Sequence, residues 1–154
     1  ENFECDEDIE ILFKGLGEIA ARYPILLPVH PRVKKILERA TFSINRNIFV
    51  RDPLDYFEMI YVLERCHGVL TDSGGLQKEA YYAGKPCVTI REETEWVELV
   101  ESGWNTLVPA MKLCEDREQI WNFLAANFAK KSRINFYGDG NTARRIKKVI
   151  REIL

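Results

Sequence analysis

The segment Asp72-Ser73-Gly74-Gly75 has the residue types of a loop that holds phosphate. It follows a short apolar run and precedes a stretch of helical spacing, which predicts a junction between a strand and a helix. Two adjacent glycines let a ligand approach the backbone without a Cβ in the way. The first helical turn adds unpaired N–H groups and the positive end of the helix dipole, which together suit a diphosphate. A plain tight turn with Ser73 as the helix cap is the alternative.

Three further polar residues have types that could complete such a site. Glu79 follows Ser73 by six residues, roughly 9 Å along a helix, where a carboxylate could accept the hydroxyls of a ribose or simply face solvent. His30 ends an apolar run and could contact a phosphate as a cation or as an N–H donor, or be a capped histidine at the edge of the core. Arg91 begins a charged loop and could pair with a phosphate or with a neighbouring acid.

The elements that must position these residues alternate between helix and strand. Short apolar runs predict strands at 24–30, 47–50, 69–71, 87–90 and 106–108, and helical spacing predicts helices at 9–20, 31–37, 55–65, 73–83, 94–101, 120–128 and 146–153. This order predicts an α/β fold of the Rossmann-like kind, a parallel sheet with helices on both faces. Because ligands bind at the carboxyl ends of such strands, His30 and residues 51–56, 72–75 and 91–94 should line one edge.

Length, composition and spacing narrow the class of protein. A chain of 154 residues predicts one domain, and a net charge of -2 argues against a nucleic-acid surface or a polybasic membrane patch. The glycine spacing matches neither a G-x-G-x-x-G nor a Walker A loop, which disfavours hydride transfer and ATP hydrolysis. The four cysteines are widely spaced, without the pattern of a disulfide framework or a zinc site, and we expect them reduced in a cytoplasmic protein. No signal peptide is visible in the sequence, and no apolar run approaches the roughly 20 residues of a membrane span.

Taken together, these segments resemble the non-hydrolysing UDP-N-acetylglucosamine 2-epimerases. The matching residues follow the family's order and cover nearly the whole chain: Pro28-Val29-His30-Pro31, Pro53-Leu54-Asp55-Tyr56, Leu70-Thr71-Asp72-Ser73-Gly74-Gly75-Leu76-Gln77-Lys78-Glu79-Ala80, Gly84-Lys85-Pro86, Arg91 with Thr94-Glu95, and Tyr137-Gly138-Asp139-Gly140. One departure is Thr94-Glu95-Trp96-Val97-Glu98, where many bacterial members have Thr-Glu-Arg-Pro-Glu. The contact that this arginine makes in the family is therefore not assigned to Trp96, and the subfamily to which the chain belongs is not determined.

The resemblance implies a larger enzyme of two Rossmann-like domains of the glycosyltransferase-B type, with the active site between them. Residues 1–154 would be the single UDP-binding C-terminal domain, and the N-terminal domain, which supplies acid/base carboxylates, would be missing. Glu1-Asn2 resembles the end of the family's His-Arg-x-Glu-Asn segment, so the catalytic histidine would lie just upstream and no catalytic residue within the chain. The implied partners are a UDP-sugar, that N-terminal domain and a second copy in a homodimer, with no nucleic acid and no membrane.

The resemblance also implies roles and a reaction. UDP-N-acetylglucosamine and UDP-N-acetylmannosamine would interconvert by elimination and re-addition of UDP, held by a phosphate clamp without metal or cofactor. A hydrolysing epimerase, a related glycosyltransferase and a non-catalytic nucleotide-sugar-binding module are the alternatives. The implied substrate-binding residues are His30 for the diphosphate, the main chain near Met59 for the uracil, Ser73, Gly74 and Gly75 for the β-phosphate, Glu79 for the ribose diol, and Arg91 for the phosphate side of the pocket.

Overall fold

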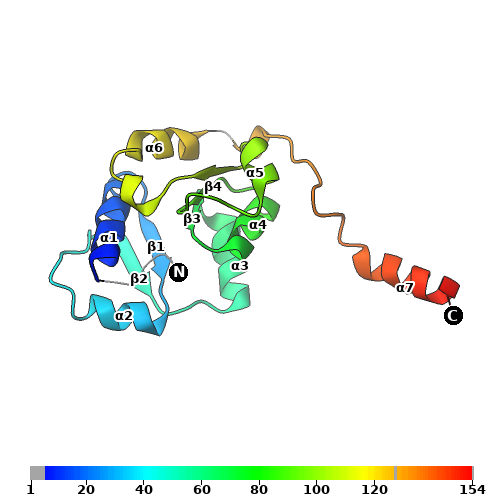
Figure 1. The fold of residues 1–154 in the computed structure, drawn as a ribbon, viewed down its shortest axis with the longest axis horizontal. Helices are drawn as coiled ribbons and strands as arrows, with labels where there is room; N and C mark the ends of the chain where they lie inside the picture. The colour runs from blue at the N-terminus through cyan, green and yellow to red at the C-terminus, as the bar shows by residue number, and fades with distance from the viewer. Residues whose placement is uncertain (1–5, 127, 154) are drawn as a thin grey trace.

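The computed structural model describes residues 6–126 and 128–153 (Figure 1). Strands and helices alternate as the sequence predicts, and the α/β class with parallel strands is confirmed. Residues Glu1-Asn2, which resemble the end of the family's His-Arg-x-Glu-Asn segment, lie outside the described residues. The elements are α1 (Asp6–Ala20), β1 (Ile25–Pro28), α2 (Pro31–Leu37), β2 (Ile48–Arg51), α3 (Tyr56–Arg65), β3 (Val69–Thr71), α4 (Gly74–Tyr82), β4 (Cys87–Thr89), α5 (Val97–Glu101), β5 (Asn105–Leu107), η1 (Ala110–Lys112), α6 (Arg117–Ala125), η2 (Phe128–Lys130) and α7 (Thr142–Ile153).

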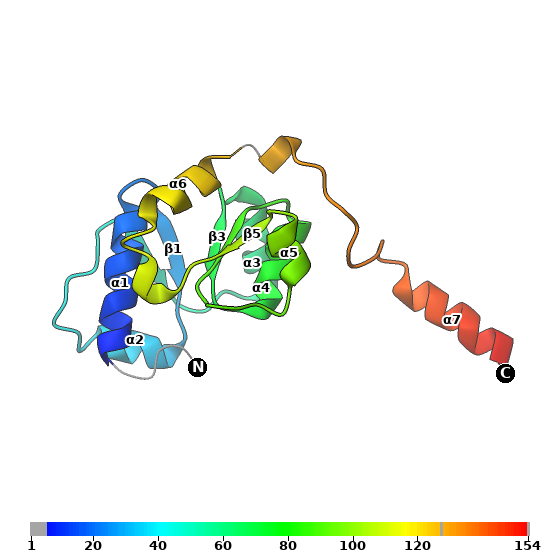
Figure 2. The same ribbon diagram turned by 45° about the horizontal axis from the view of Figure 1, so that its top comes forward.

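The strands divide between two parallel sheets instead of one. β1 pairs with β2, and β3, β4 and β5 form a second sheet in that order. A cavity of about 630 Å³ lies between β1 and β3, and the two strands stand apart in both ribbon views (Figures 1 and 2).

Prolines explain why β1 leaves its second edge unpaired. The N–H groups of Ile25 and Val29 donate to the carbonyls of Asn47 and Arg51, on the β2 side, at 2.9 and 3.0 Å. Because the N–H groups of successive residues in a strand point to opposite edges, positions 24, 26 and 28 face the other edge. Pro24 and Pro28 have no N–H, and Leu26 alone keeps a donor there. An edge with a single donor cannot carry a regular ladder to β3.

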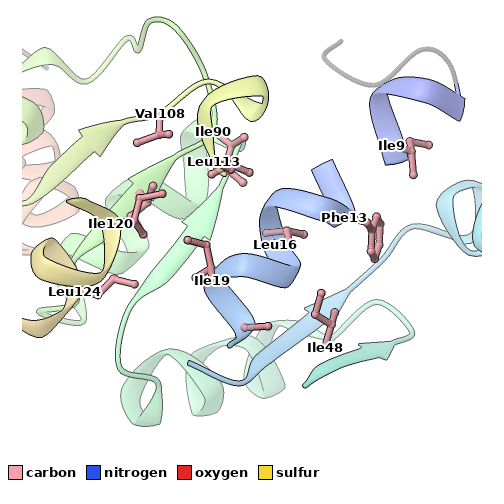
Figure 3. Packing of buried hydrophobic residues seen from close by; sticks show 12 residues of the cluster. Ile9, Phe13, Leu16, Ile19, Ile48, Ile90, Val108, Leu113, Ile120 and Leu124 are labelled. Atoms are coloured by element: carbon pink, nitrogen blue, oxygen red, sulfur yellow. The ribbon is translucent and has the colours of Figure 1, made fainter. Parts of the chain in front are cut away.

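The main core fills the space between α1, the two sheets and α6 (Figure 3). Ile19 and Ile120 are fully buried there, and Gly15 lets α1 approach η1 because a Cβ at that position would overlap Leu113. A second cluster joins α3, β3, α4 and β4 around Leu63 and Ala80. Helix α4 is therefore held against its own sheet by packing, and this fixes the loop that precedes it.

Helix α7 stands away from the rest of the domain in both views and is joined to it by an extended segment (Figures 1 and 2). Its apolar residues Ile146, Val149, Ile150 and Ile153 are exposed. Within residues 6–126 and 128–153, no helix has both the length and the apolar character needed to cross a membrane.

Candidate functional site

Ser73 is the N-cap residue of α4, but its side chain makes no capping hydrogen bond. Its backbone N–H donates to Thr71 Oγ1 at 3.0 Å, and its carbonyl accepts from the Gln77 N–H at 3.3 Å. Ser73 and Gly75 are exposed, and the first-turn N–H groups of α4 have no partner within the helix. The alternative that the hydroxyl serves only as a helix cap does not fit this geometry, because the hydroxyl makes no capping bond and has no hydrogen-bond partner among the described residues.

The loop 91–96 closes over the start of α4. The Trp96 Nε1–H donates to the Gly74 carbonyl at 2.9 Å, and Lys78 Nζ lies 4.0 Å from the centre of a Trp96 ring. A Cβ built on Gly74 would overlap Glu95 Oε1. A side chain at position 74 would therefore have to displace the Glu95 carboxylate. Trp96, which replaces the arginine of many bacterial family members, anchors the loop.

Arg91 forms an ion pair with a neighbouring acid, Glu95, which is one of the two partners that the sequence allows for it. Its Nη1 lies 3.1 Å from Glu95 Oε2, with side-chain exposures of 31% for Arg91 and 48% for Glu95. Arg91 therefore lies beside the loop at Gly74 through Glu95. The structure brings Arg91, Glu95 and the glycines together at the carboxyl ends of β3 and β4.

A buried polar network beneath this loop was not predicted from the sequence. Thr94 Oγ1 donates to Gln77 Oε1 at 2.7 Å, and Asn105 Nδ2 donates to the same oxygen at 2.9 Å. Thr89 Oγ1 in turn donates to Asn105 Oδ1 at 2.9 Å. Gln77 is fully buried and Asn105 nearly so. The only sequence signal was a polar residue inside an apolar strand, Thr89, and a glutamine on the inner face of α4.

His30 lies at the surface as the N-cap of α2, at the carboxyl end of β1. The Arg32 backbone N–H donates to its Nδ1 at 3.3 Å. Because Nδ1 accepts, the ring proton resides on Nε2, which is left as a donor. Among the described residues, no hydrogen bond or ion pair links His30 to the loop at Ser73. What the two share is that each follows the carboxyl end of its strand, β1 for His30 and β3 for Ser73.

Met59 lies one turn into α3, behind a rigid start. Asp55 and Glu58 form a capping box, with backbone-to-carboxylate distances of 2.8 and 2.9 Å. The Met59 N–H donates to the Asp55 carbonyl at 2.9 Å and is therefore occupied. A flat ring near Met59 would find its free donors on Tyr56 and Phe57, the first residues of the helix.

Glu79 lies on the exposed side of α4, four residues beyond Gly75 and thus on the same face. No side chain in the described part of the chain forms a hydrogen bond or an ion pair with its carboxylate. Because Glu79 lies on the same face as Gly75, its role in binding the ribose stays a prediction.

Thiols and metal ligands take no visible part in this site. Cys66, Cys87 and Cys114 are free, and burial raises the pKa of the Cys87 thiol to about 12, which makes it unreactive. No three His, Cys, Asp or Glu side chains within residues 6–126 and 128–153 are grouped so as to hold a metal ion.

A parallel α/β domain with an open strand-to-helix loop at the carboxyl ends of its strands belongs to the Rossmann-like class. The family model described as UDP-N-acetylglucosamine 2-epimerase matches residues 1–151, and the chain belongs to that family.

The relatives give the chain its place within longer proteins. A Pseudomonas aeruginosa UDP-2,3-diacetamido-2,3-dideoxy-D-glucuronate 2-epimerase is 38% identical over 99% of this chain and 42% of its own length. A Methanococcus maripaludis UDP-N-acetylglucosamine 2-epimerase homolog is 37% identical over 99% and 42%. The Methanocaldococcus jannaschii UDP-GlcNAc 2-epimerase, solved in complex with UDP-GlcNAc and UDP, superimposes with a TM-score of 0.79 at 31% identity, over 98% of this chain and 42% of that one. The chain thus spans less than half of these relatives and corresponds to their C-terminal part.

Proposed function

We propose that this chain is the UDP-binding part of a UDP-N-acetylglucosamine 2-epimerase, which interconverts UDP-GlcNAc and UDP-ManNAc. The observation that carries the proposal is the loop Ser73-Gly74-Gly75, with an uncommitted hydroxyl and the free N–H groups of α4, in a member of this family. The M. jannaschii relative that was solved with UDP-GlcNAc and UDP supports a nucleotide-sugar as the ligand.

Each predicted residue has a place in this proposal. The hydroxyl of Ser73 and the N–H groups at Gly74 and Gly75 would hold the β-phosphate. His30 would donate from Nε2 to the diphosphate, and Glu79 would accept the two ribose hydroxyls. The uracil would lie near Met59, read by the first turn of α3. Arg91 would add positive charge on the phosphate side.

The reaction makes a tight hold on UDP necessary. UDP leaves C1 as a proton leaves C2, and it must add back before it escapes. N–H groups and cations fixed around the diphosphate spread the leaving-group charge without rearrangement of solvent. The groups that move the C2 proton would lie outside this chain, on a histidine upstream of Glu1 and on carboxylates of an N-terminal domain. We expect the whole protein to be a homodimer in the cytoplasm.

A second candidate is a 2-epimerase for a UDP-2,3-diacetamido sugar acid. The P. aeruginosa relative with that activity in its name favours it. Both candidates invert C2 and hold the same UDP, so they differ only in the sugar that the rest of the enzyme accepts.

Turnover assays of the full-length protein distinguish these possibilities. We expect UDP-GlcNAc to give UDP-ManNAc, with deuterium from heavy water at C2, as elimination and re-addition require. Free N-acetylmannosamine plus UDP would identify a hydrolysing enzyme, and conversion of the sugar acid alone would favour the second candidate. Ser73→Ala should slow turnover at least tenfold, whereas Ser43→Ala, at an exposed loop serine, should not. No conversion of either substrate would refute an epimerase.

A further inference from the structure

The carboxylate of Glu95 lies beside the first residue of α4, next to the loop where a ligand phosphate is expected. Its Oε1 fills the space that a Cβ on Gly74 would take. The N-terminus of a helix attracts anions through its dipole and its unpaired N–H groups. A side-chain carboxylate seated there has the charge and the oxygen atoms of the ligand group.

The second oxygen of the same carboxylate neutralises the cation of the site. Glu95 Oε2 lies 3.1 Å from Arg91 Nη1. One carboxylate therefore lies against Gly74 with one oxygen and holds Arg91 with the other. These are two of the groups assigned to the diphosphate.

The backbone around Glu95 is held far more firmly than its side chain. Thr94 is fixed by its bond to buried Gln77, and Trp96 by its bond to the Gly74 carbonyl. Within the described part of the chain, the Glu95 side chain forms only a partly exposed ion pair, a kind of contact that contributes little to stability. The carboxylate can therefore swing out while the loop stays in place.

We propose that Glu95 is an internal anion that occupies the phosphate loop of the free protein and is displaced by the diphosphate of UDP. The inference rests on the proposed function. On binding, Arg91 passes from Glu95 to the ligand, and the displaced carboxylate opposes the incoming charge. A lone phosphate must overcome the same competition without the contacts of ribose and base, so the device favours a complete nucleotide.

The test is calorimetric titration of UDP into the full-length protein and its variants. Glu95→Gln keeps the shape and removes the charge, and we expect the UDP dissociation constant to fall about three- to tenfold. Glu95→Ala, which removes the carboxylate entirely, should act in the same direction. Glu93→Gln is the matched control, because it removes one charge from an exposed position in the same loop. It should leave the constant within about twofold.

The outcomes separate the inference from the function on which it rests. If the wild-type protein binds UDP and Glu95→Gln binds it equally or more weakly, Glu95 is no competitor and the inference is overturned. If neither the wild type nor any variant binds UDP at millimolar concentration, the proposed function fails and the inference falls with it. Tighter binding by Glu93→Gln to the same extent would reduce the effect to net charge and would also overturn it.

Discussion

The indole N–H of Trp96 donates to the carbonyl of Gly74 at 2.9 Å, so the loop after β4 is tied to the first residue of α4. Lys78, one turn further along α4, lies over the ring of the same tryptophan. A residue that breaks the usual family pattern thus stabilises the segment at which phosphate is expected to bind.

Two replacements of Trp96 should destabilise the protein to different extents. Trp96→Phe keeps a ring for Lys78 and loses the N–H donor, so we expect the free energy of unfolding to fall by about 1 kcal/mol. Trp96→Arg also places a cation beside Lys78, and the loss should reach about 2 kcal/mol. Urea unfolding followed by circular dichroism measures both changes. Equal stability of the wild type and Trp96→Arg would show that the indole bond contributes nothing.

Gly74→Ala should separate folding from binding. Its methyl group overlaps the end of the flexible Glu95 side chain and makes only an ordinary contact with Trp96 Nε1, so the melting temperature should change by no more than about 3 °C. The same methyl group stands between a phosphate and the backbone, and the UDP dissociation constant should rise at least about tenfold. Thermal melts and calorimetry on one preparation check the two halves of this prediction. Unchanged UDP affinity would place the phosphate elsewhere.

His30→Asn is designed to keep the cap and to remove the Nε2–H donor, because the amide N–H groups of the shorter asparagine lie closer to the backbone. An asparagine at the N-cap can accept a hydrogen bond from the first turn of α2, as His30 Nδ1 does now. Stability should therefore stay within about 0.5 kcal/mol, while the loss of Nε2–H weakens UDP binding about tenfold. A matched His67→Asn, at a histidine whose Nε2 lies 2.8 Å from the Leu124 carbonyl, should leave UDP affinity unchanged. If the two variants bind UDP alike, His30 has no role in holding the diphosphate.

Gln77→Leu should be costly because it leaves the amide of Asn105 and the hydroxyl of Thr94 without their shared acceptor. Unsatisfied buried polar groups lower the free energy of unfolding by about 2–4 kcal/mol in such a case. Gln119→Leu, at an exposed position on α6, is the control and should change it by less than about 0.5 kcal/mol. Chemical denaturation measures both, and a small effect at Gln77 would mean that the network adds no net stability.

The sequence predicted the parts of the structure that depend on local pattern. The alternating elements follow from apolar runs and helical spacing, and the Ser73 loop follows from two glycines ahead of a helix. The predicted start of α5 was wrong by three residues, because the helix begins at Val97 and not at Thr94. The reason is physical, because the Thr94 hydroxyl accepts from the Trp96 N–H at 3.1 Å and donates to Gln77, which holds this stretch outside the helix.

The features that the sequence did not predict depend on contacts between distant segments. The split between β1 and β3 reflects two prolines on one edge, a pattern that matters only once the pairing partner is known. The bond between Gln77 and Asn105 spans 28 residues, and neither residue type marks a buried position. The placement of Glu95 over Gly74 likewise required the fold. The ligand roles of His30, Met59, Glu79 and Arg91 stay predictions.

The most direct test of the central claim is a UDP titration of the full-length protein with glycine-selective ¹⁵N labelling. If the loop holds the β-phosphate, the amide resonances of Gly74 and Gly75 should show the largest shifts, because their N–H groups receive the charge. Gly15 and Gly17, which lie in α1 against Leu113 and Asn45 and outside the proposed site, provide internal controls and should move little. Saturable UDP binding that leaves Gly74 and Gly75 unshifted would contradict the account.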